Sequence, residues 1–326
     1  MNNRRKLLVA MGASVLAYAP LLSAQPGKVW RIGFLGATSA AGYTVEIDAI
    51  RARFRELGYV EGRNILIEFR WAQGDPEKLE PMALELVALK PDVIITHAIP
   101  PTRASAQATR TIPIIMADGQ DPVVAGLAAT YAKPGGNVTG STSFQAEITG
   151  KRLEFLMEAV PRVKRVAVIF NPSNPNAPYP LKELEKAAAQ MKVELFRFTA
   201  KATEEIPGAF AAMSKQRVDA LVVGEDPLIN TNNAAIAALA ASHRLPSTGF
   251  TNLPDAGGLI GYGANRPLLY ARAANFADKI FKGAKAGDLP IERATKFDLI
   301  INLKTARALG IKIPQSLLQR ADRVIQ

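Results

Sequence analysis

Short apolar runs alternate with amphipathic segments along most of the chain. A run bounded by turn residues predicts a buried strand, and apolar positions that recur every three or four residues predict a helix. In the first half of the chain, this pattern predicts strands over 29–35, 64–71, 93–96 and 112–116, and helices over 43–57, 76–89 and 102–109. Strands that alternate with helices are typical of an α/β protein whose parallel sheet is covered by helices on both faces.

The same alternation repeats in the second half. It predicts strands over 166–170, 193–198, 220–223, 247–250 and 259–262, and helices over 147–160, 181–191, 204–213 and 232–243. A long helix over 266–282, a strand over 297–302 and a helical turn over 305–309 follow, which are too few elements for a third unit. We therefore expect the chain to recross between two lobes, with 29–141 plus 263–295 in the N-terminal lobe and 142–262 plus 296–326 in the C-terminal lobe. Lobes joined by several crossing strands predict a hinged cleft.

The segment 111–140 is the most informative single stretch. Its apolar run ends abruptly in Asp118-Gly119-Gln120-Asp121, and a small-residue segment then leads to Gly135-Gly136. We interpret this as a buried strand, a polar turn, a short helix and a structural bend. Because ligands bind outside the carboxyl ends of parallel strands, Asp118 is expected to contact a ligand, whereas Asp121 is expected to cap the short helix.

Residues 1–24 have the pattern of an export signal. Arg4-Arg5-Lys6 precedes an apolar region, and Leu22-Ser23-Ala24 resembles a cleavage site. An anchoring helix is disfavoured because the apolar region is short and is interrupted by Gly12 and Pro20. The chain contains no cysteine, which excludes a lipid-attachment cysteine, disulfides and thiol chemistry. We expect the mature protein in the periplasm, and the sequence leaves open whether it is exported through the general or the twin-arginine route.

Composition excludes several classes of protein. The hydrophobic fraction of 48% and the charged fraction of 21% are those of a globular protein. The formal net charge of +11 falls to +8 without Arg4, Arg5 and Lys6 of the leader, and the remaining basic residues are interleaved with acids rather than clustered. This distribution argues against a nucleic-acid-binding protein.

No catalytic, metal-binding or cofactor-binding motif is present. The chain has two histidines, no nucleophile elbow, no P-loop and no zinc-protease motif. Gly33, Gly36 and Gly42 surround the first strand-to-helix turn, but their spacing is not that of a dinucleotide-binding loop. We therefore expect no cofactor, no metal and no enzymatic activity.

Polar residues recur instead where each predicted strand ends. In the first lobe they are Thr38, Ser39, Tyr43, His97, Thr102 and Asp118, and in the second Asn174, Asn176, Tyr179, Glu225, Asp226 and Asn252. Taken one loop at a time, such residues also serve as ordinary turn and cap residues. Together they predict a cleft that hydrogen-bonds a small polar ligand. For an amino acid, Asp118, Glu225 or Asp226 would meet the ammonium group and Thr or Asn donors the carboxylate, while Tyr43 and Tyr179 would stack on the ligand or only cover the core.

Three motifs resemble one known family. The chain opens with RIGFLG and FRELGYVEGRNILIEFRWAQGD, continues with TIPIIMADGQDPVVAGLAATYAKPGGNVTG, and ends with FDLIINLKTARALGIKIPQSLLQRADRVI. These motifs are similar to those of ABC-transporter substrate-binding proteins of the tryptophan- and tyrosine-binding type. The resemblance implies two Rossmann-like lobes of the periplasmic-binding-protein type I kind, three hinge crossings, and permease and ATPase partners. It makes an aromatic amino acid the leading ligand candidate, although the loop NPSNPNAPYP is proline-rich and poor in aromatic residues.

We therefore expect a monomeric periplasmic receptor that captures a small organic solute for an importer. The alternative is a periplasmic sensing partner of a sensor kinase or chemoreceptor, because docking surfaces leave no simple motif. A repressor of the same fold is excluded, since a leader stands where a helix-turn-helix would be needed.

Overall fold

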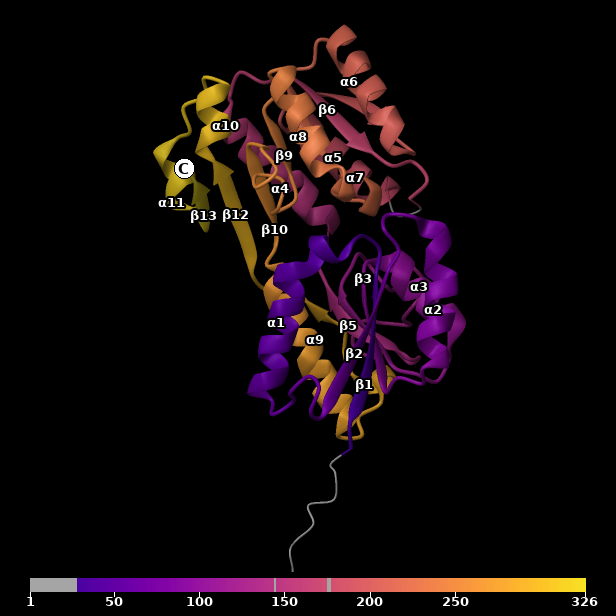
Figure 1. The fold of residues 1–326 in the computed structure, drawn as a ribbon. Coiled ribbons are helices and arrows are strands. Elements are labelled where there is room, and N and C mark those ends of the chain that lie inside the picture. Colours follow the sequence, from indigo (N-terminus) through magenta and orange to yellow (C-terminus); the bar gives the residue numbers. More distant parts are fainter. Residues whose placement is uncertain (1–27, 144, 175–176) are drawn as a thin grey trace, which may run out of the picture.

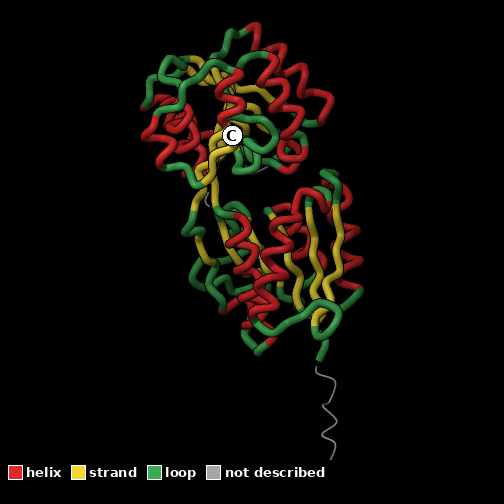
Figure 2. Tube along the Cα trace, turned by 60° about the vertical axis from the view of Figure 1, so that its left-hand side comes forward, coloured by secondary structure: helices red, strands yellow, loops and turns green. Residues whose placement is uncertain are grey.

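The computed structural model describes residues 28–143, 145–174 and 177–326, and it shows two α/β lobes stacked one above the other (Figure 1). Each lobe is an open sheet with helices on both faces (Figure 2). The predicted two-lobed α/β class is confirmed. The predicted export signal lies outside the described residues.

The sheet of the first lobe is parallel throughout. Its strand order is β11 (Glu292–Arg293), β5 (Val138–Thr142), β4 (Ile114–Asp118), β3 (Val93–His97), β1 (Trp30–Gly36) and β2 (Ile65–Trp71). Helices α1 (Thr44–Glu56) and α9 (Arg266–Phe281) pack on one face, and α2 (Leu79–Ala88) and α3 (Ile99–Ala108) pack on the other. The 3-10 helices η1 (Ala40–Tyr43), η2 (Pro76–Lys78) and η4 (Ala286–Asp288) complete this lobe.

The sheet of the second lobe contains one antiparallel pair. Its order is β13 (Arg323–Ile325), β12 (Phe297–Asn302), β10 (Ile260–Ala264), β9 (Ser247–Gly249), β8 (Ala220–Val223), β6 (Arg165–Phe170) and β7 (Glu194–Thr199), and only β10 and β12 run antiparallel. One face is covered by α4 (Gln145–Ala159), α5 (Pro178–Gln190), α10 (Leu303–Ala308) and α11 (Gln315–Gln319). The other face is covered by η3 (Thr203–Glu205), α6 (Ile206–Lys215), α7 (Pro227–Thr231) and α8 (Asn233–Ser242).

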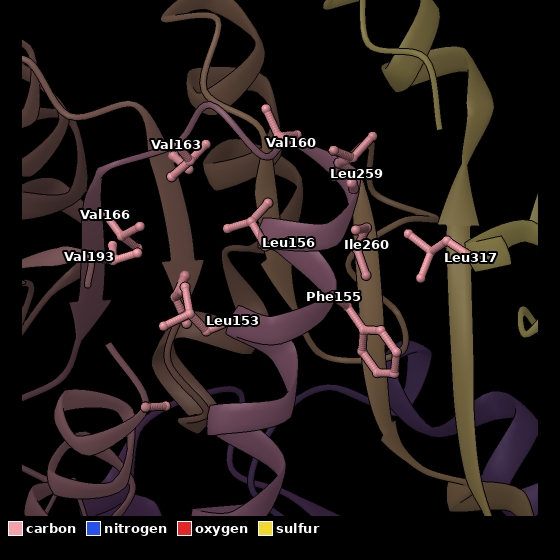
Figure 3. Packing of buried hydrophobic residues seen from close by; sticks show 14 of the residues in the cluster. Leu153, Phe155, Leu156, Val160, Val163, Val166, Val193, Leu259, Ile260 and Leu317 are labelled. Carbon is pink, nitrogen blue, oxygen red and sulfur yellow. The ribbon is translucent and has the colours of Figure 1, made fainter. Parts of the chain in front are cut away.

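Helix α4 shows how the periodic pattern becomes a core. Leu153, Leu156 and Val160 recur at helical spacing and point toward the strands that carry Val166 and Ile260 (Figure 3). All five side chains are buried, and burying each leucine or isoleucine contributes about 1.5–3 kcal/mol. The apolar stripe of α4 therefore fixes which of its faces lies against the sheet.

The chain crosses between the lobes three times: between β5 and α4, at Asn265 between β10 and α9, and over 294–296 between β11 and β12. Asn265 ties two of these crossings together. Its side-chain oxygen accepts a hydrogen bond from the Leu268 N–H at 2.9 Å, which caps α9, and its amide nitrogen donates to Asp298 Oδ2 at 2.7 Å. The long β12 strand descends from the upper lobe to this hinge in Figure 1.

The short helix expected after Asp121 does not form. Asp121 Oδ1 accepts hydrogen bonds from the N–H groups of Val123 and Val124 at 2.9 and 3.1 Å, so its capping role is present. The segment continues as turns because Gly126 takes a left-handed conformation with φ of 71°, which ends the first helical turn. The Gly135 bend is structural, since its N–H donates to Gly287 O at 3.0 Å.

Gly140 in the middle of β5 is predicted to be intolerant of any side chain. Its φ is 131°, and a Cβ there would lie 2.1 Å from the Met116 carbonyl oxygen of β4. We expect Gly140→Ala to lower the free energy of unfolding by about 2–4 kcal/mol, as measured by urea denaturation. The matched control is Gly136→Ala, because a Cβ at Gly136 would meet nothing within 4 Å. Equal stability of the two variants would contradict this account.

Candidate functional site

The two sheets turn the carboxyl ends of their strands toward each other. In each sheet the strand order reverses once, between β1 and β3 in the first lobe and between β6 and β8 in the second. Loops that diverge at such a switch point leave a crevice, which is where open α/β sheets bind their ligands. The loops after β1, β3, β6 and β8 therefore define the candidate site.

A central cavity lies between these loops. The first lobe contributes Ala37, Thr38, Tyr43, His97, Ala98, Gln120 and Arg266, and the second contributes Glu225, Asp226, Pro227, Asn230 and Phe250. A smaller cavity beside it is lined by Asp118, Ser143, Arg152 and Thr251 among others, and the two share Glu225, Phe250 and Arg266. We treat them together as the central cavity.

Arg266 is the buried cation at the centre of the first-lobe wall. It stands at the start of α9, directly after the crossing at Asn265, and its Nε lies 3.3 Å from Glu46 Oε1 of α1. Its guanidinium is 5.9 Å from the ring centres of both Tyr43 and Tyr270. Burial opposes its charge, but Glu46 and the neighbouring tyrosines outweigh burial and raise the pKa of Arg266 above its usual value.

Asp118 ends β4 with an incompletely satisfied carboxyl group. It is 4% exposed, and its Oδ1 has no hydrogen-bond partner within the protein. Burial, reinforced by the negative charge of Glu225, raises the pKa of Asp118 to about 7, while Arg266, the Ser143 hydroxyl and the Gly119 N–H oppose this rise. The carboxyl group is thus poised to change charge near neutral pH.

A register shift brings His97 beside Asp118. The pairing of β3 with β4 is regular up to Thr96 and then slips, so that His97 lies opposite Asp118. Burial, and after it the charge of Arg266, lowers the pKa of His97 well below its usual value, so the imidazole is neutral. Its Nδ1 has no partner within the protein. The next residue, Ala98, has a φ of 66°, a strained conformation that the Ala98 N–H bond to Asp118 O at 2.7 Å helps to hold.

Glu225 is the acid of the opposing wall. It follows β8, and its Oε2 lies 3.1 Å from Nη2 of Arg152 on α4. Arg152 is 2% exposed and also donates from Nε to Tyr262 O at 2.7 Å, so it is held rigidly. Glu225, which is paired with Arg152, therefore lines the same cavity as Asp118, which has no ion-pair partner.

A cluster of asparagine side chains orients Asn230. Its Oδ1 accepts hydrogen bonds from Asn233 Nδ2 at 2.9 Å and from Asn252 Nδ2 at 3.1 Å, and Asn233 Nδ2 also donates to Asn252 Oδ1 at 3.1 Å. Asn230 lines the central cavity. Because its side-chain oxygen already accepts two hydrogen bonds, its amide N–H₂ group is the part that can donate to a ligand.

Of the residues expected from the sequence, Thr38, Tyr43, His97, Asp118, Glu225 and Asp226 line the central cavity. Tyr43 is also a core residue, with its ring stacked on Trp71 at 5.2 Å between centroids and its hydroxyl bonded to Thr38 and to the backbone. Asp226 caps α7 through the Leu228 N–H at 2.8 Å and accepts a bond from Asn174 Nδ2 at 2.9 Å. Burial raises the pKa of Asp226, against these bonds.

The remaining expected residues lie elsewhere. Thr102 was expected to begin α3, but the helix begins at Ile99, and the buried Thr102 hydroxyl donates to Ala98 O at 2.7 Å inside the lobe. Ser39 precedes η1, and Tyr179 is 55% exposed on the first turn of α5; neither lines the central cavity. Asn252 stands behind Asn230. Asn174 borders a lateral cavity beside the central one. Asn176 lies outside the described residues.

Sequence reasoning placed the loop 118–121 in the cleft without singling out Gln120, and it missed Arg266, Arg152, Asn230 and Phe250. Two of them left a signal. Arg266 lies two residues after the end of β10, and Arg152 lies on the apolar stripe of α4, four residues after Ile148 and four before Leu156. A charged residue on a buried helix face needs a partner, which here is Glu225.

The described part of the chain holds no cluster of three or more His, Cys, Asp or Glu side chains suited to a metal ion. Over the same residues, no helix has the length and apolar character to cross a membrane.

The fold and the site define a class of protein: a receptor that encloses a solute between two lobes. Residues 38–325 match the model of the ABC transporter substrate binding protein family. The chain belongs to that family, whose members bind solutes rather than catalyse reactions and work with ABC permease and ATPase components.

Three similar proteins place the chain within the family. A tyrosine-binding protein of Clostridioides difficile is 30% identical over 256 residues, covering 78% of this chain and 73% of that protein. An ABC domain from Streptococcus pneumonia in complex with L-Trp is 28% identical, with a TM-score of 0.85. The ligand-free, open structure of a substrate binding protein with adhesive properties from Clostridium difficile is 25% identical, with a TM-score of 0.69. Both structures are matched over 91% of this chain and over their whole length.

The raised pKa of Asp118 predicts a pH-dependent stability. Between about pH 4 and pH 7 the folded chain retains a proton that the unfolded chain releases, so this contribution is complete below the unfolded pKa and is lost as the pH rises toward 7. We expect urea denaturation at about pH 5 and pH 8 to show a loss of up to roughly 2.6 kcal/mol that Asp118→Asn lacks. The exposed Asp48 on α1 supplies the control, because Asp48→Asn should keep the wild-type dependence. A wild-type slope in Asp118→Asn would contradict the assignment.

Proposed function

We propose that this protein captures a small organic solute carrying an ammonium group, with an aromatic amino acid as the leading candidate, and delivers it to an ABC importer. The two relatives that bind tyrosine and tryptophan support the amino-acid class. The export signal expected over residues 1–24 supports a periplasmic site of action.

One observation carries the ammonium assignment. Three buried polar atoms on the first-lobe wall of the central cavity have no hydrogen-bond partner within the protein: His97 Nδ1, Asp118 Oδ1 and Gln120 Oε1. Leaving such groups unpaired costs about 1–3 kcal/mol each, so a ligand that pairs with them gains affinity. The two side-chain oxygens accept hydrogen bonds unless Asp118 is protonated, and an ammonium group offers three donors.

The charges of the cavity favour the same ligand. Arg266 is compensated by Glu46 and Arg152 by Glu225. Of the two other carboxyl groups in the cavity wall, Asp226 has both oxygens hydrogen-bonded, whereas Asp118 Oδ1 has no partner within the protein. A ligand cation between Asp118 and Glu225 removes their mutual repulsion and restores the charge of Asp118. The Asn230 amide remains for the carboxylate end of an amino acid.

Ligand capture and lobe closure are coupled in this arrangement. The ammonium site takes Asp118 from the first lobe and Glu225 from the second, so the full set of contacts exists only when the lobes are closed. A ligand shifts the hinge equilibrium only by its differential affinity for the closed state. Hydrogen bonds from the ligand to these unpaired acceptors supply the difference in affinity between the closed and the open state.

A thermal-shift screen with matched ligand pairs tests the proposal. Each amino acid is paired with the acid that lacks its amino group, for example L-tryptophan with indole-3-propionic acid. We expect an amino acid at 100 times its dissociation constant to add roughly 2.7 kcal/mol of stability, and its deaminated partner to add far less. Deaminated acids that stabilise as strongly as the amino acids would remove the ammonium assignment.

Asp118→Asn tests the residue assignment. Loss of the charge should weaken binding of the amino acid about 10- to 100-fold by isothermal titration calorimetry at about pH 8, where Asp118 is ionised. It should leave the deaminated acid unaffected. Asp48→Asn, the same change on an exposed face, should bind like the wild type.

A further inference from the structure

The two lobes place acidic side chains against each other in the central cavity. Asp118 ends β4 of the first lobe, Glu225 follows β8 of the second, and both line the smaller part of the cavity. Glu225 is paired with Arg152, whereas Asp118 has no ion-pair partner among the described residues and its Oδ1 accepts no hydrogen bond. Two carboxylates in a space shielded from water repel each other, and protonation of one removes the repulsion. Asp118 is the carboxyl group that takes the proton.

The other groups around Asp118 come from its own lobe or from the crossing after β5. Arg266 of α9 and the Ser143 hydroxyl favour the charged carboxylate. His97 lies opposite Asp118 on β3 and is neutral, because burial and then Arg266 lower the pKa of His97. Tyr270 of α9 keeps its proton, since burial raises the pKa of Tyr270 well above its usual value.

Helix α3 also packs on β4, but it brings no charge to the cavity. Its charged residue, Arg103, is exposed and donates a hydrogen bond from Nη2 to Ala125 O at 2.9 Å. The neighbours within the first lobe thus stay with Asp118 when the lobes separate. Glu225, by contrast, moves away with the second lobe.

Asp226, the other acid of the central cavity, is held within the second lobe. Its carboxyl group accepts hydrogen bonds from Asn171 Nδ2 at 3.3 Å, from Asn174 Nδ2 at 2.9 Å and from the Leu228 N–H at 2.8 Å. All of these donors move with Asp226, so separation of the lobes leaves its bonds intact. Asp118 is therefore the acid whose surroundings change most when the lobes separate.

Separation of the lobes changes the proton affinity of Asp118. In this structure, burial and then the charge of Glu225 raise the pKa of Asp118 to about 7. When the lobes part, water reaches the carboxyl group and Glu225 is withdrawn, so the pKa falls toward its usual value of about 4. Acid favours the arrangement with the higher pKa, and each unit of difference changes the ratio of the two arrangements up to tenfold.

We propose that protonation of Asp118 is a switch for the empty receptor: in acid the neutral carboxyl group lets the lobes stay together without a ligand, and as the pH rises through neutrality the charge of Asp118 drives them apart. This switch acts before any solute binds and does not depend on which solute the cavity accepts. The cleft of the empty receptor is then most accessible at neutral and higher pH, whereas acid keeps it shut.

The test measures the distance between the lobes at two pH values. Because the chain has no native cysteine, Glu77→Cys and Glu204→Cys supply two unique positions for spin labels. Both residues are exposed, on η2 and η3, which follow the edge strands β2 and β7 on the side away from the crossings. Double electron–electron resonance on the full chain, unfolded and refolded to remove any ligand, gives the populations of the short and the long distance. We expect the ratio of short to long to rise at least tenfold from about pH 8 to about pH 5.

Three variants in the labelled chain isolate Asp118. Asp118→Asn keeps the shape of the side chain without its charge, so it should show the short distance at both pH values. Asp48→Asn, the same change on the exposed face of α1, should keep the wild-type response. Glu225→Gln removes the opposing charge and should weaken the response without abolishing it, because burial of Asp118 is the larger cause. Circular dichroism checks that each variant is folded.

The proposal fails if the wild-type ratio is the same at both pH values, or if Asp118→Asn responds as the wild type does. A ratio that falls in acid also overturns it and assigns the response to His97, whose charged form is favoured by water that enters between the lobes. If Asp118→Asn does not fold, an undiminished response in Glu225→Gln is the overturning result. None of these outcomes bears on the proposed ligand class, because no ligand is present.

Discussion

The antiparallel pair of β10 and β12 constrains the whole molecule, because two of the three crossings between the lobes adjoin the same end of this pair. The pair spans Ile260 opposite Ile301 to Ala264 opposite Phe297. Asn265 and Asp298 bond at the lower end of the pair, where the chain enters α9 and leaves β11. The pair belongs to the second sheet, whereas α9 and β11 belong to the first lobe. The position of the pair therefore determines how the carboxyl ends of the strands in one sheet face those in the other. The cleft follows from that geometry.

The cleft buries several charged side chains. A buried charge is tolerated when it is paired, and Arg266 with Glu46 and Arg152 with Glu225 meet this condition. Asp118 does not, and its pKa rises accordingly. The protein thus retains one unfavourable group at the place where a ligand cation would lie. Strain at Ala98 and the register shift before His97 fall at the same point, as is common for functional sites.

Patterns of local sequence predicted most of the elements, since strand and helix periods are written into neighbouring residues. The strands over 30–36, 65–71, 93–97, 165–170, 194–199 and 220–223 lie within a residue or two of their expected bounds. The short helix after Asp121 failed because the left-handed conformation of Gly126 outweighed a weak helical pattern. The short elements β11, β13 and α7 were missed, because an element of so few residues is too short to show a hydrophobic period.

The sequence by itself determined the α/β class, the family and the strand ends at which polar residues gather, because these depend on local periodicity and on motifs. Only the tertiary structure decided which of those residues face one another. Arg266 and Arg152 enter the site through crossings and helix packing that no local window contains. Thr102, by contrast, is near the site in sequence but bonds inside its own lobe. Proximity across a cleft depends on how two sheets are oriented, and that orientation is set by long-range contacts between segments far apart in the chain.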